Sequence, residues 1–95
     1  MNDQYYIKRA RKGDLDAFSW LMDRYKPMAY SLALRILKNR EEAEEIVQES
    51  FVKAFQSISR FRAESSFSTW LFKIVYNSCI SLTRKKKRER VPIEQ

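Results

Sequence analysis

The apolar positions of this chain recur at helical spacing along most of its length. Between residues 17 and 37 they return every three or four residues, and the same period governs residues 43–55 and 67–82. This spacing places a stripe of apolar side chains along one side of a helix. A shorter helix is indicated before residue 13, where apolar side chains occupy positions 5, 6, 7 and 10. We therefore predict an all-α fold, a compact bundle of about four to five helices.

Capping residues indicate where these helices begin and end. Gly13 suits the position after the first helix, and Asp14 is a good N-cap for the second. Asn39 followed by Glu42 has the spacing of a capping box for the third helix. Pro27 interrupts the second stripe, because a proline inside a helix removes a hydrogen bond and crowds the preceding turn. Two helices at an angle and one kinked helix both fit this pattern.

The third predicted helix has an acidic outer face. Its predicted buried positions are Ala43, Ile46, Val47, Ser50, Phe51, Ala54 and Phe55. Its outer positions include Glu41, Glu42, Glu45, Gln48, Glu49 and Val52. Glu45 and Glu49 are one turn apart, where like charges repel by roughly a few tenths of a kcal/mol. Such a face fits a cationic partner, and it fits equally a face that only water covers.

Residues 57–66 are predicted to connect this helix to the last one, with Ile58 and Phe61 held in the core. Either Ser65 or Ser66 can cap the last helix. Its predicted buried stripe is Phe67, Trp70, Leu71, Ile74, Ser78 and Leu82, and its other faces carry Lys73, Tyr76, Asn77 and Arg84. The helical period weakens after residue 82, where a basic segment begins. Residues 91–93 suggest extended backbone, because the residue before a proline avoids the helical region.

Aromatic, amide and basic side chains beside this loop and helix indicate contact with nucleic acid. Aromatic rings can stack on bases, an amide can read a base edge, and cations neutralise phosphate. The basic segment, residues 84–90, holds six cations and one acid. Simpler interpretations stay open, however. The basic segment is compatible with a solvated tail. Asn77 is compatible with a surface position that merely tolerates an asparagine. The aromatic residues at positions 67 and 70 are favoured as core residues over base-stacking ones.

Composition narrows the possible classes of function. A formal net charge of +7 favours a polyanionic partner. The chain contains no histidine and one cysteine, Cys79, which excludes an internal disulfide and a zinc site within it. The thiol is expected to be reduced and buried or half-buried. No cofactor is expected, and a small hydrolase is disfavoured because no nucleophile, base or metal ligand accompanies the carboxylates.

The chain lacks the apolar segments that address proteins to membranes. No apolar run approaches the length of a membrane span, and the N-terminus has no apolar signal-peptide core. We expect a cytoplasmic protein without membrane insertion.

Three segments together resemble an extracytoplasmic-function (ECF) sigma factor of bacterial RNA polymerase. They read Lys-Gly-Asp-Leu-Asp-Ala-Phe at 12–18, Arg-Glu-Glu-Ala-Glu-Glu-Ile-Val-Gln-Glu-Ser-Phe at 40–51, and Phe-Arg-Ala-Glu-Ser-Ser-Phe-Ser-Thr-Trp-Leu-Phe-Lys-Ile at 61–74. The resemblance covers the whole chain, in order, and concerns the promoter-melting domain, region 2. Family members carry a second helical domain for the −35 element. We therefore expect residues 1–90 to form region 2 and residues 91–95 to begin a linker to an absent region 4 domain.

The resemblance implies a domain that binds the polymerase core and recognises and melts the −10 promoter element. The acidic helix would dock on the coiled coil of the beta-prime clamp through Glu45, Gln48 and Glu49, with Arg35 and Phe51 in support. The loop at 62–66 would receive a flipped base of the non-template strand. The implied DNA contacts are Arg62, Ala63, Glu64, Ser65, Ser66, Lys73, Tyr76, Asn77, Arg84, Lys85, Lys86 and Lys87. An anti-sigma factor is a further implied partner.

Two positions depart from the family pattern. Ala63 stands where the family commonly has glycine, and Ser81 stands where it often has aspartate. Both leave the base preference open. Two other functions remain compatible with the residues: a general nucleic-acid-binding domain without a polymerase partner, and a protein-interaction module whose basic end is inert.

Overall fold

The computed structural model describes residues 3–62 and 64–90, and this part of the chain contains four α-helices and one short 3-10 helix. The helices are α1 (Asp3–Arg11), α2 (Leu15–Leu37), α3 (Arg40–Ser57) and α4 (Phe67–Arg90), and the 3-10 helix η1 (Ile58–Arg60) follows α3. The predicted all-α bundle is confirmed. Residues 91–95, which we expected to begin a linker, lie outside the described residues.

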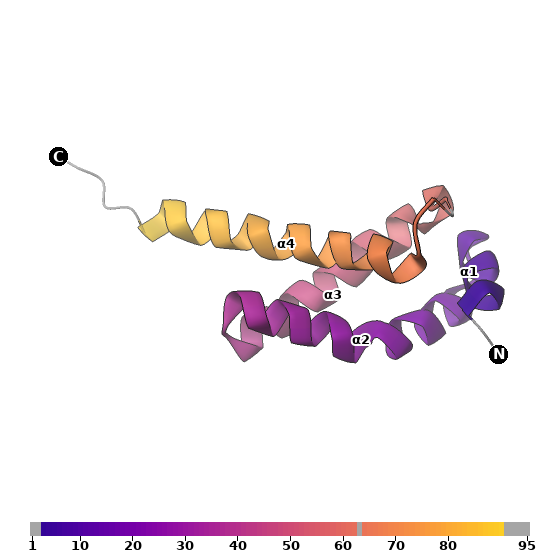
Figure 1. The fold of residues 1–95 in the computed structure, drawn as a ribbon, viewed down its shortest axis with the longest axis horizontal. Coiled ribbons are helices and arrows are strands. Elements are labelled where there is room, and N and C mark those ends of the chain that lie inside the picture. Colours follow the sequence, from indigo (N-terminus) through magenta and orange to yellow (C-terminus); the bar gives the residue numbers. More distant parts are fainter. Residues whose placement is uncertain (1–2, 63, 91–95) are drawn as a thin grey trace.

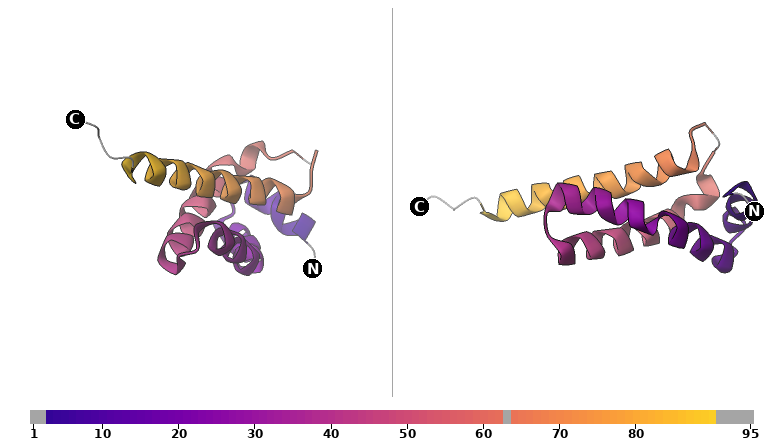
Figure 2. Two further views of the ribbon diagram at one scale, coloured as in Figure 1. Left: turned by 60° about the vertical axis from the view of Figure 1, so that its left-hand side comes forward. Right: turned by 60° about the horizontal axis from the view of Figure 1, so that its bottom comes forward.

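The three long helices pack on one another, and α1 covers one end of the group (Figure 1). Each of α2, α3 and α4 contacts the other two, whereas α1 packs on α2 and η1. The loop before α4 lies at the same end as α1. At the opposite end the last turns of α4 extend past the turn between α2 and α3, as Figure 1 and both views in Figure 2 show. The two ends of α4 are therefore in different surroundings.

The predicted caps set the ends of the helices. Asp14 Oδ1 accepts from the Ala17 N–H at 3.2 Å, and Asn39 Oδ1 accepts from the Glu42 N–H at 2.9 Å. Gly13 has a φ of +95°, which a glycine adopts without steric cost. The other half of the expected capping box differs from the prediction, because the carboxylate of Glu42 binds Lys86 of α4. Tertiary packing thus draws this side chain away from its own helix end.

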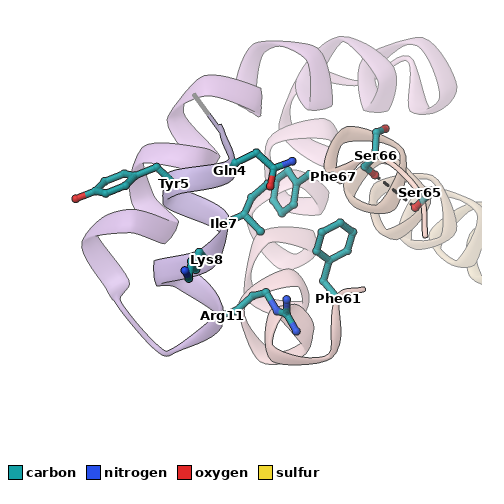
Figure 3. A pocket seen from close by; sticks show the side chains of 9 residues that line it. All are labelled: Gln4, Tyr5, Ile7, Lys8, Arg11, Phe61, Ser65, Ser66 and Phe67. Atoms are coloured by element: carbon teal, nitrogen blue, oxygen red, sulfur yellow. Dashed lines mark hydrogen bonds between the residues drawn. The ribbon is translucent and has the colours of Figure 1, made fainter. Parts of the chain in front are cut away.

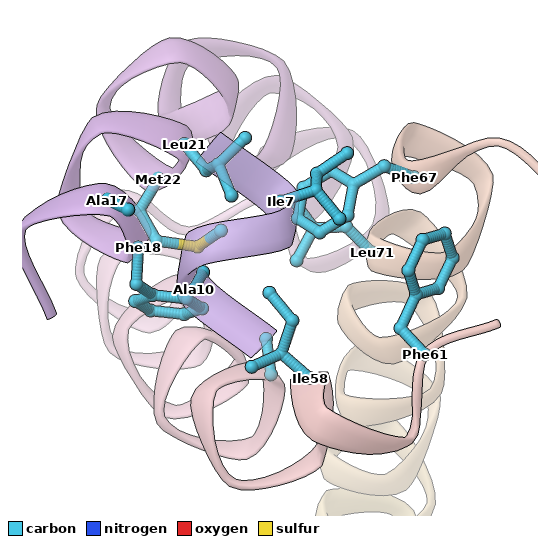
Figure 4. Packing of buried hydrophobic residues seen from close by; sticks show 11 residues of the cluster. Ile7, Ala10, Ala17, Phe18, Leu21, Met22, Ile58, Phe61, Phe67 and Leu71 are labelled. Atoms are coloured by element: carbon cyan, nitrogen blue, oxygen red, sulfur yellow. The ribbon is translucent and has the colours of Figure 1, made fainter. Parts of the chain in front are cut away.

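The buried side chains form two clusters. The first joins α1, the start of α2, the end of α3, η1 and the start of α4, and Figure 4 shows it with Ile7, Leu21, Ile58, Phe61, Phe67 and Leu71 converging. The second lies between α2, α3 and α4 further along and contains Ala29, Ala33, Ala43, Ile46, Val47, Val75 and Cys79. Phe51 packs against both clusters. The small residues of the second cluster allow the three long helices to approach closely.

Several positions differ from the sequence prediction or decide between its alternatives. α2 continues as one helix through Pro27, so the chain does not divide there into two helices. Phe55 was predicted to be buried but is 38% exposed, because Ala54 and Ile58 already fill the core beside it. Met28, in the predicted stripe of α2, is 52% exposed. Val75 was missed, although it is fully buried one turn from Leu71 and Cys79.

None of the described helices combines the length and the apolar character that a bilayer-crossing segment needs.

Candidate functional site

A pocket of about 500 Å³ lies between α1 and the loop that precedes α4. Its floor is aromatic: Phe61 and Phe67 are each 5% exposed, and their rings meet edge to face with centroids 5.7 Å apart. Ser65 and Ser66 line it from the loop, and Gln4, Tyr5, Ile7, Lys8 and Arg11 line it from α1. Figure 3 shows this arrangement, with Arg11 extending toward the side where Phe61 lies. We call this cavity the loop pocket.

The sequence located only half of the loop pocket. The loop at 62–66 was expected to receive a base, and its Ser65 and Ser66 line the pocket, whereas Glu64 is exposed outside the lining. The contribution of α1 was missed, because nothing in residues 3–11 indicates which distant segment they face. The short helix could only be placed here by the tertiary fold, in which Ile7 joins the core cluster that contains both phenylalanines.

Hydroxyl groups fix the start of α4 at the rim of the pocket. Ser66 Oγ accepts from the Thr69 N–H at 3.1 Å and bonds Thr69 Oγ1 at 2.8 Å. Ser65 Oγ donates to the Ser66 carbonyl at 3.4 Å. Of the two candidate caps, Ser66 therefore caps the helix. Arg62 and Glu64 are exposed beside it, and Ala63, also expected to contact DNA, lies outside the described residues.

The ring of Trp70 packs against the aromatic residues at both ends of this loop. Its ring lies 5.2 Å from that of Phe61 and 5.5 Å from that of Phe67, measured between centroids. The interpretation of Phe67 as a core residue is confirmed, and Trp70 is partly buried against the same core cluster. Trp70 thus packs against the two phenylalanines of the pocket floor, while Ser65 and Ser66 line the pocket with hydroxyl groups.

Five of the expected DNA-contacting residues share one exposed side of α4. At about 100° per residue, Lys73, Tyr76, Asn77, Arg84 and Lys87 fall within an arc of about 100°. All five are exposed, Tyr76 by 50%. We call this surface the open face of α4. Its first residue, Lys73, lies six residues after Phe67 of the loop pocket, about 9 Å along the helix, and the face continues to the basic segment.

Asn77 lies where the open face meets α3. It lines a groove with Ser78 and Ser81 of α4 and with Lys53 and Gln56 of α3. Lys53 Nζ donates to Ser78 Oγ at 3.2 Å and pairs with Glu49 at 3.1 Å. Asn77 therefore lies beside Lys53 and Ser78, two polar side chains that are hydrogen-bonded to each other. The two α3 residues were not predicted here, because their register against α4 is a property of helix packing.

The basic segment is helical and its cations differ in surroundings. We expected a basic tail, whereas α4 continues through Arg90. Lys86, predicted to contact DNA, is instead turned inward and binds the two carboxylate oxygens of Glu42 at 2.9 and 3.0 Å. Lys85 is exposed but lies outside the arc of the open face. Arg84 and Lys87 are the cations of this segment that continue the open face.

The acidic outer face of α3 is exposed as predicted. Glu45, Gln48 and Glu49 surround Val52, which is 57% exposed, in a shallow hollow that reaches Leu82 of α4. We call this surface the acidic face. Glu49 also pairs with Lys53 one turn later.

Two residues expected to act with the acidic face lie elsewhere. Arg35 lines a groove between α2 and α4, with Met28 and Phe72, on another side of the helix group. Phe51 is partly buried between the two core clusters, so its role is in packing.

Two further ionisable side chains, Cys79 and Tyr25, have shifted pKa values. Burial raises the pKa of the Cys79 thiol, which is fully buried as expected. Burial, and then the hydrogen bond to Asp3, raises the pKa of the Tyr25 hydroxyl. Within residues 3–62 and 64–90 no group of three or more histidine, cysteine, aspartate or glutamate side chains could hold a metal ion.

Comparison with known sequences and structures gives a consistent set of relatives. The family model of sigma-70 region 2 matches residues 21–89. The chain is 47% identical over 81 residues to ECF RNA polymerase sigma factor SigW of Bacillus subtilis, covering 85% of this chain and 43% of that protein. It is 41% identical over 78 residues to the ECF RNA polymerase sigma-E factor of Haemophilus influenzae, covering 82% and 41%. The chain thus spans about two fifths of the length of these relatives.

Solved structures also resemble the fold. The NMR structure of an engineered region 2 of sigmaE in complex with GTAAAA has a TM-score of 0.88 and 32% identity, covering 97% of this chain and 96% of that one. CnrH in complex with the cytosolic domain of CnrY has a TM-score of 0.72 and 28% identity, covering 83% and 51%.

Proposed function

The chain belongs to the sigma-70 region 2 family, with ECF sigma factors among its relatives, and on that premise we propose that it directs RNA polymerase to promoters. It binds the polymerase core through the acidic face of α3, at the coiled coil of the beta-prime clamp. It recognises and opens the −10 element by holding the non-template strand along the loop pocket and the open face of α4. It acts in the cytoplasm as a binding module, and polymerisation belongs to the core enzyme.

The observation that carries the DNA part is the loop pocket at the start of α4, the helix whose exposed side is the open face. A base inside a duplex hides its pairing edge, so reading it requires extrusion at a cost of a few kcal/mol. A pocket with an aromatic floor and a hydroxyl rim can accept an extruded base, which offsets that cost. The region 2 of sigmaE, with the same fold, was solved with the six-nucleotide sequence GTAAAA.

The residues of the open face have different roles in DNA binding, which follow from their side-chain chemistry. The amide of Asn77 can donate to and accept from one base, and Tyr76 offers an exposed ring for stacking. Lys73, Arg84 and Lys87 carry charge that neutralises phosphate without reading sequence. The loop and Asn77 therefore set the base preference, and the cations supply affinity.

The polymerase part of the proposal rests on charge and apolar area together. The acidic face presents two glutamates and an amide around the exposed Val52. A cationic coiled coil with an apolar contact at its centre would complement it. Because Arg35 lies on another side of the helix group, we leave it outside this docking surface. A protein partner of the kind seen with CnrH, which was solved with the cytosolic domain of CnrY, is a further part of the proposal.

Two binding measurements on the purified chain test the function. Single-stranded oligonucleotides in which each −10 position is varied in turn should reveal a preference for particular bases. A fragment of the beta-prime clamp coiled coil should bind the chain with an affinity that falls as salt rises. Base-independent DNA binding together with no binding to the coiled coil would favour the rival, a general nucleic-acid-binding domain. Absence of salt-dependent DNA binding would favour a protein-interaction module.

A further inference from the structure

We propose that Lys8 and Arg11 of α1 bind the phosphates that flank the nucleotide in the loop pocket. This inference rests on the proposed function, and it adds to the DNA site a helix that precedes the family-matched residues 21–89. The ligand is single-stranded DNA, and the contact is with its backbone.

The geometry of α1 presents a stripe to the pocket. Gln4, Lys8 and Arg11 follow one another at intervals of four and three residues, so they lie on one face of the helix. All three are exposed at their outer ends and all three line the pocket (Figure 3). Ile7, on the inner side of that face, is 9% exposed and anchors α1 to the core. The stripe is therefore held at a fixed position relative to the loop.

The cationic side chains of α1 differ in their ion pairs and hydrogen bonds. Arg9 pairs with Asp14 at 2.5 Å and bonds the Tyr5 hydroxyl at 2.8 Å. These partners, the Asp14 hydrogen bond first, raise the pKa of its guanidinium. Within the described part of the chain, by contrast, Lys8 and Arg11 form no ion pair. The two cations that face the pocket are therefore available to a ligand.

The charges in the lining of the loop pocket point to α1 as the phosphate-binding element. The loop residues that line the pocket, Ser65 and Ser66, are neutral, so its two positive charges come from α1 alone. The basic segment cannot replace them. Arg84 is 17 residues beyond Phe67, about 25 Å along the helix at 1.5 Å per residue. That separation is well beyond the screening length of about 10 Å at 0.1 M salt.

Matched charge variants test the inference. Lys8→Gln with Arg11→Gln removes two charges from the pocket and keeps good helix formers. Lys12→Gln with Lys26→Gln removes two charges from exposed positions that do not line it. Binding of the preferred −10 oligonucleotide should weaken about 10-fold or more in the first variant at 0.1 M salt, with a salt slope lower by roughly 1.4 for two phosphates. The second variant should lose less than about threefold, as expected for charges without a direct phosphate contact.

A phosphate scan locates the contact. Methylphosphonate, which is uncharged, replaces each linkage of the oligonucleotide in turn and then the two linkages beside the extruded base together, and 2-aminopurine fluorescence identifies that base. Where both of these linkages are neutral, wild type and the Lys8→Gln, Arg11→Gln variant should bind equally. An unchanged affinity of this variant, or a loss that persists when both linkages are neutral, overturns the inference and leaves the proposed function intact. A wild-type chain without any −10 preference overturns both.

Discussion

At the scale of single residues, polar side chains at helix ends do most of the positioning. Asp14 accepts from the Ala17 N–H and also binds Arg9 of α1, so it caps α2 and ties the two helices together. Ser66 caps α4 at the rim of the loop pocket. Both functions depend on short side chains whose oxygen reaches a free backbone N–H.

Asp14 makes the stability of the fold depend on pH. The Ala17 N–H, and then Arg9, lower the pKa of its carboxyl below the ordinary value of 3.8. A carboxyl with a lowered folded-state pKa stabilises above its unfolded pKa, and that contribution is lost as the pH falls through the folded pKa. Asp14→Asn keeps a capping side chain but cannot ionise. We therefore expect its melting temperature to lie below that of wild type above about pH 5, and the difference to shrink below about pH 4.

The partner variant separates the two causes of this pH dependence. Arg9→Gln should remove the part that arises from the ion pair and keep the part from the backbone N–H. If the difference in melting temperature between wild type and Asp14→Asn stays constant from pH 7 to pH 2, the carboxylate charge contributes nothing to the stability of the fold.

Asn77 should set base choice at one position of the −10 element. Its amide is exposed in the groove with Lys53, Gln56 and Ser81, where a base edge could be read. Losing such a contact costs about 1–3 kcal/mol of discrimination. We expect Asn77→Ala to flatten the preference at one nucleotide in the single-stranded binding assay. Ser31→Ala, an exposed position on α2, serves as the control, and an unaltered base profile in Asn77→Ala would place specificity elsewhere.

At the scale of whole helices, α3 and α4 each carry two different sides. α3 buries small and branched residues inward and presents the acidic face outward. α4 buries Leu71, Val75 and Cys79 while its open face carries amide, ring and cations. An amphipathic helix can thus serve packing and binding at once.

Charge reversal on α3 should abolish docking on the polymerase. Glu45→Lys with Glu49→Lys changes the acidic face by four charges, and removing one partner of a desolvated pair typically costs about 2–5 kcal/mol. We expect no binding to a beta-prime coiled-coil fragment in a pull-down, with helicity by circular dichroism retained. Asp16→Lys with Glu64→Lys makes the same change in net charge away from this face and should bind normally. Wild-type affinity in the α3 variant would exclude this face as the docking surface.

The cations of the basic segment should fall into two groups. Arg84→Ala with Lys87→Ala should lower the salt slope for single-stranded DNA by roughly 1.4 and weaken all sequences alike. Lys86→Ala should leave the slope nearly unchanged and cost up to about 1 kcal/mol of stability, because its partner is Glu42 at a partly exposed position. Equal slopes for the two variants would mean that Lys86 leaves Glu42 to bind DNA. A loss confined to one −10 sequence would mean that the segment reads bases.

At the scale of the whole molecule, the two proposed binding surfaces lie on different parts of one rigid core. The loop pocket sits at the end covered by α1, and the acidic face lies on the outer side of α3. The core clusters that connect them share Phe51. Substitutions at one surface should therefore leave binding at the other surface unchanged, as long as the buried residues are kept.

Exchanging the loop should therefore alter DNA choice without altering docking. Residues 62–65 are replaced by those of a relative, while Ser66 is kept because it caps α4. We expect a changed preference among −10 oligonucleotides, an unchanged affinity for the coiled coil and a melting temperature near that of wild type. Phe67→Ala provides the contrast, because truncating a buried phenylalanine costs about 3–5 kcal/mol and should impair both activities. A loop exchange that also abolishes docking would show that the two surfaces are coupled.

Local patterns in the sequence determined the helices, their caps and most of the exposed polar faces. The apolar period, Asp14, Asn39 and Ser66 act over a few residues, so they can be read without knowing the fold. The predicted acidic face and four of the five residues of the open face were recognised before the structure was known, as exposed positions on predicted helices. Lys87 was recognised as part of the basic segment and not as a position on this helix face. The functions of both faces remain proposals.

Tertiary structure decided which distant segments meet. The pairing of Lys86 with Glu42, the separate position of Arg35 and the exposure of Phe55 all depend on how helices pack. So does the approach of Lys8 and Arg11 to Phe61, across about fifty residues of chain. Periodicity specifies the side of a helix that is buried, but it carries no information about the partner that covers it. The loop pocket, which needs α1 as its second wall, therefore emerged only from the folded chain.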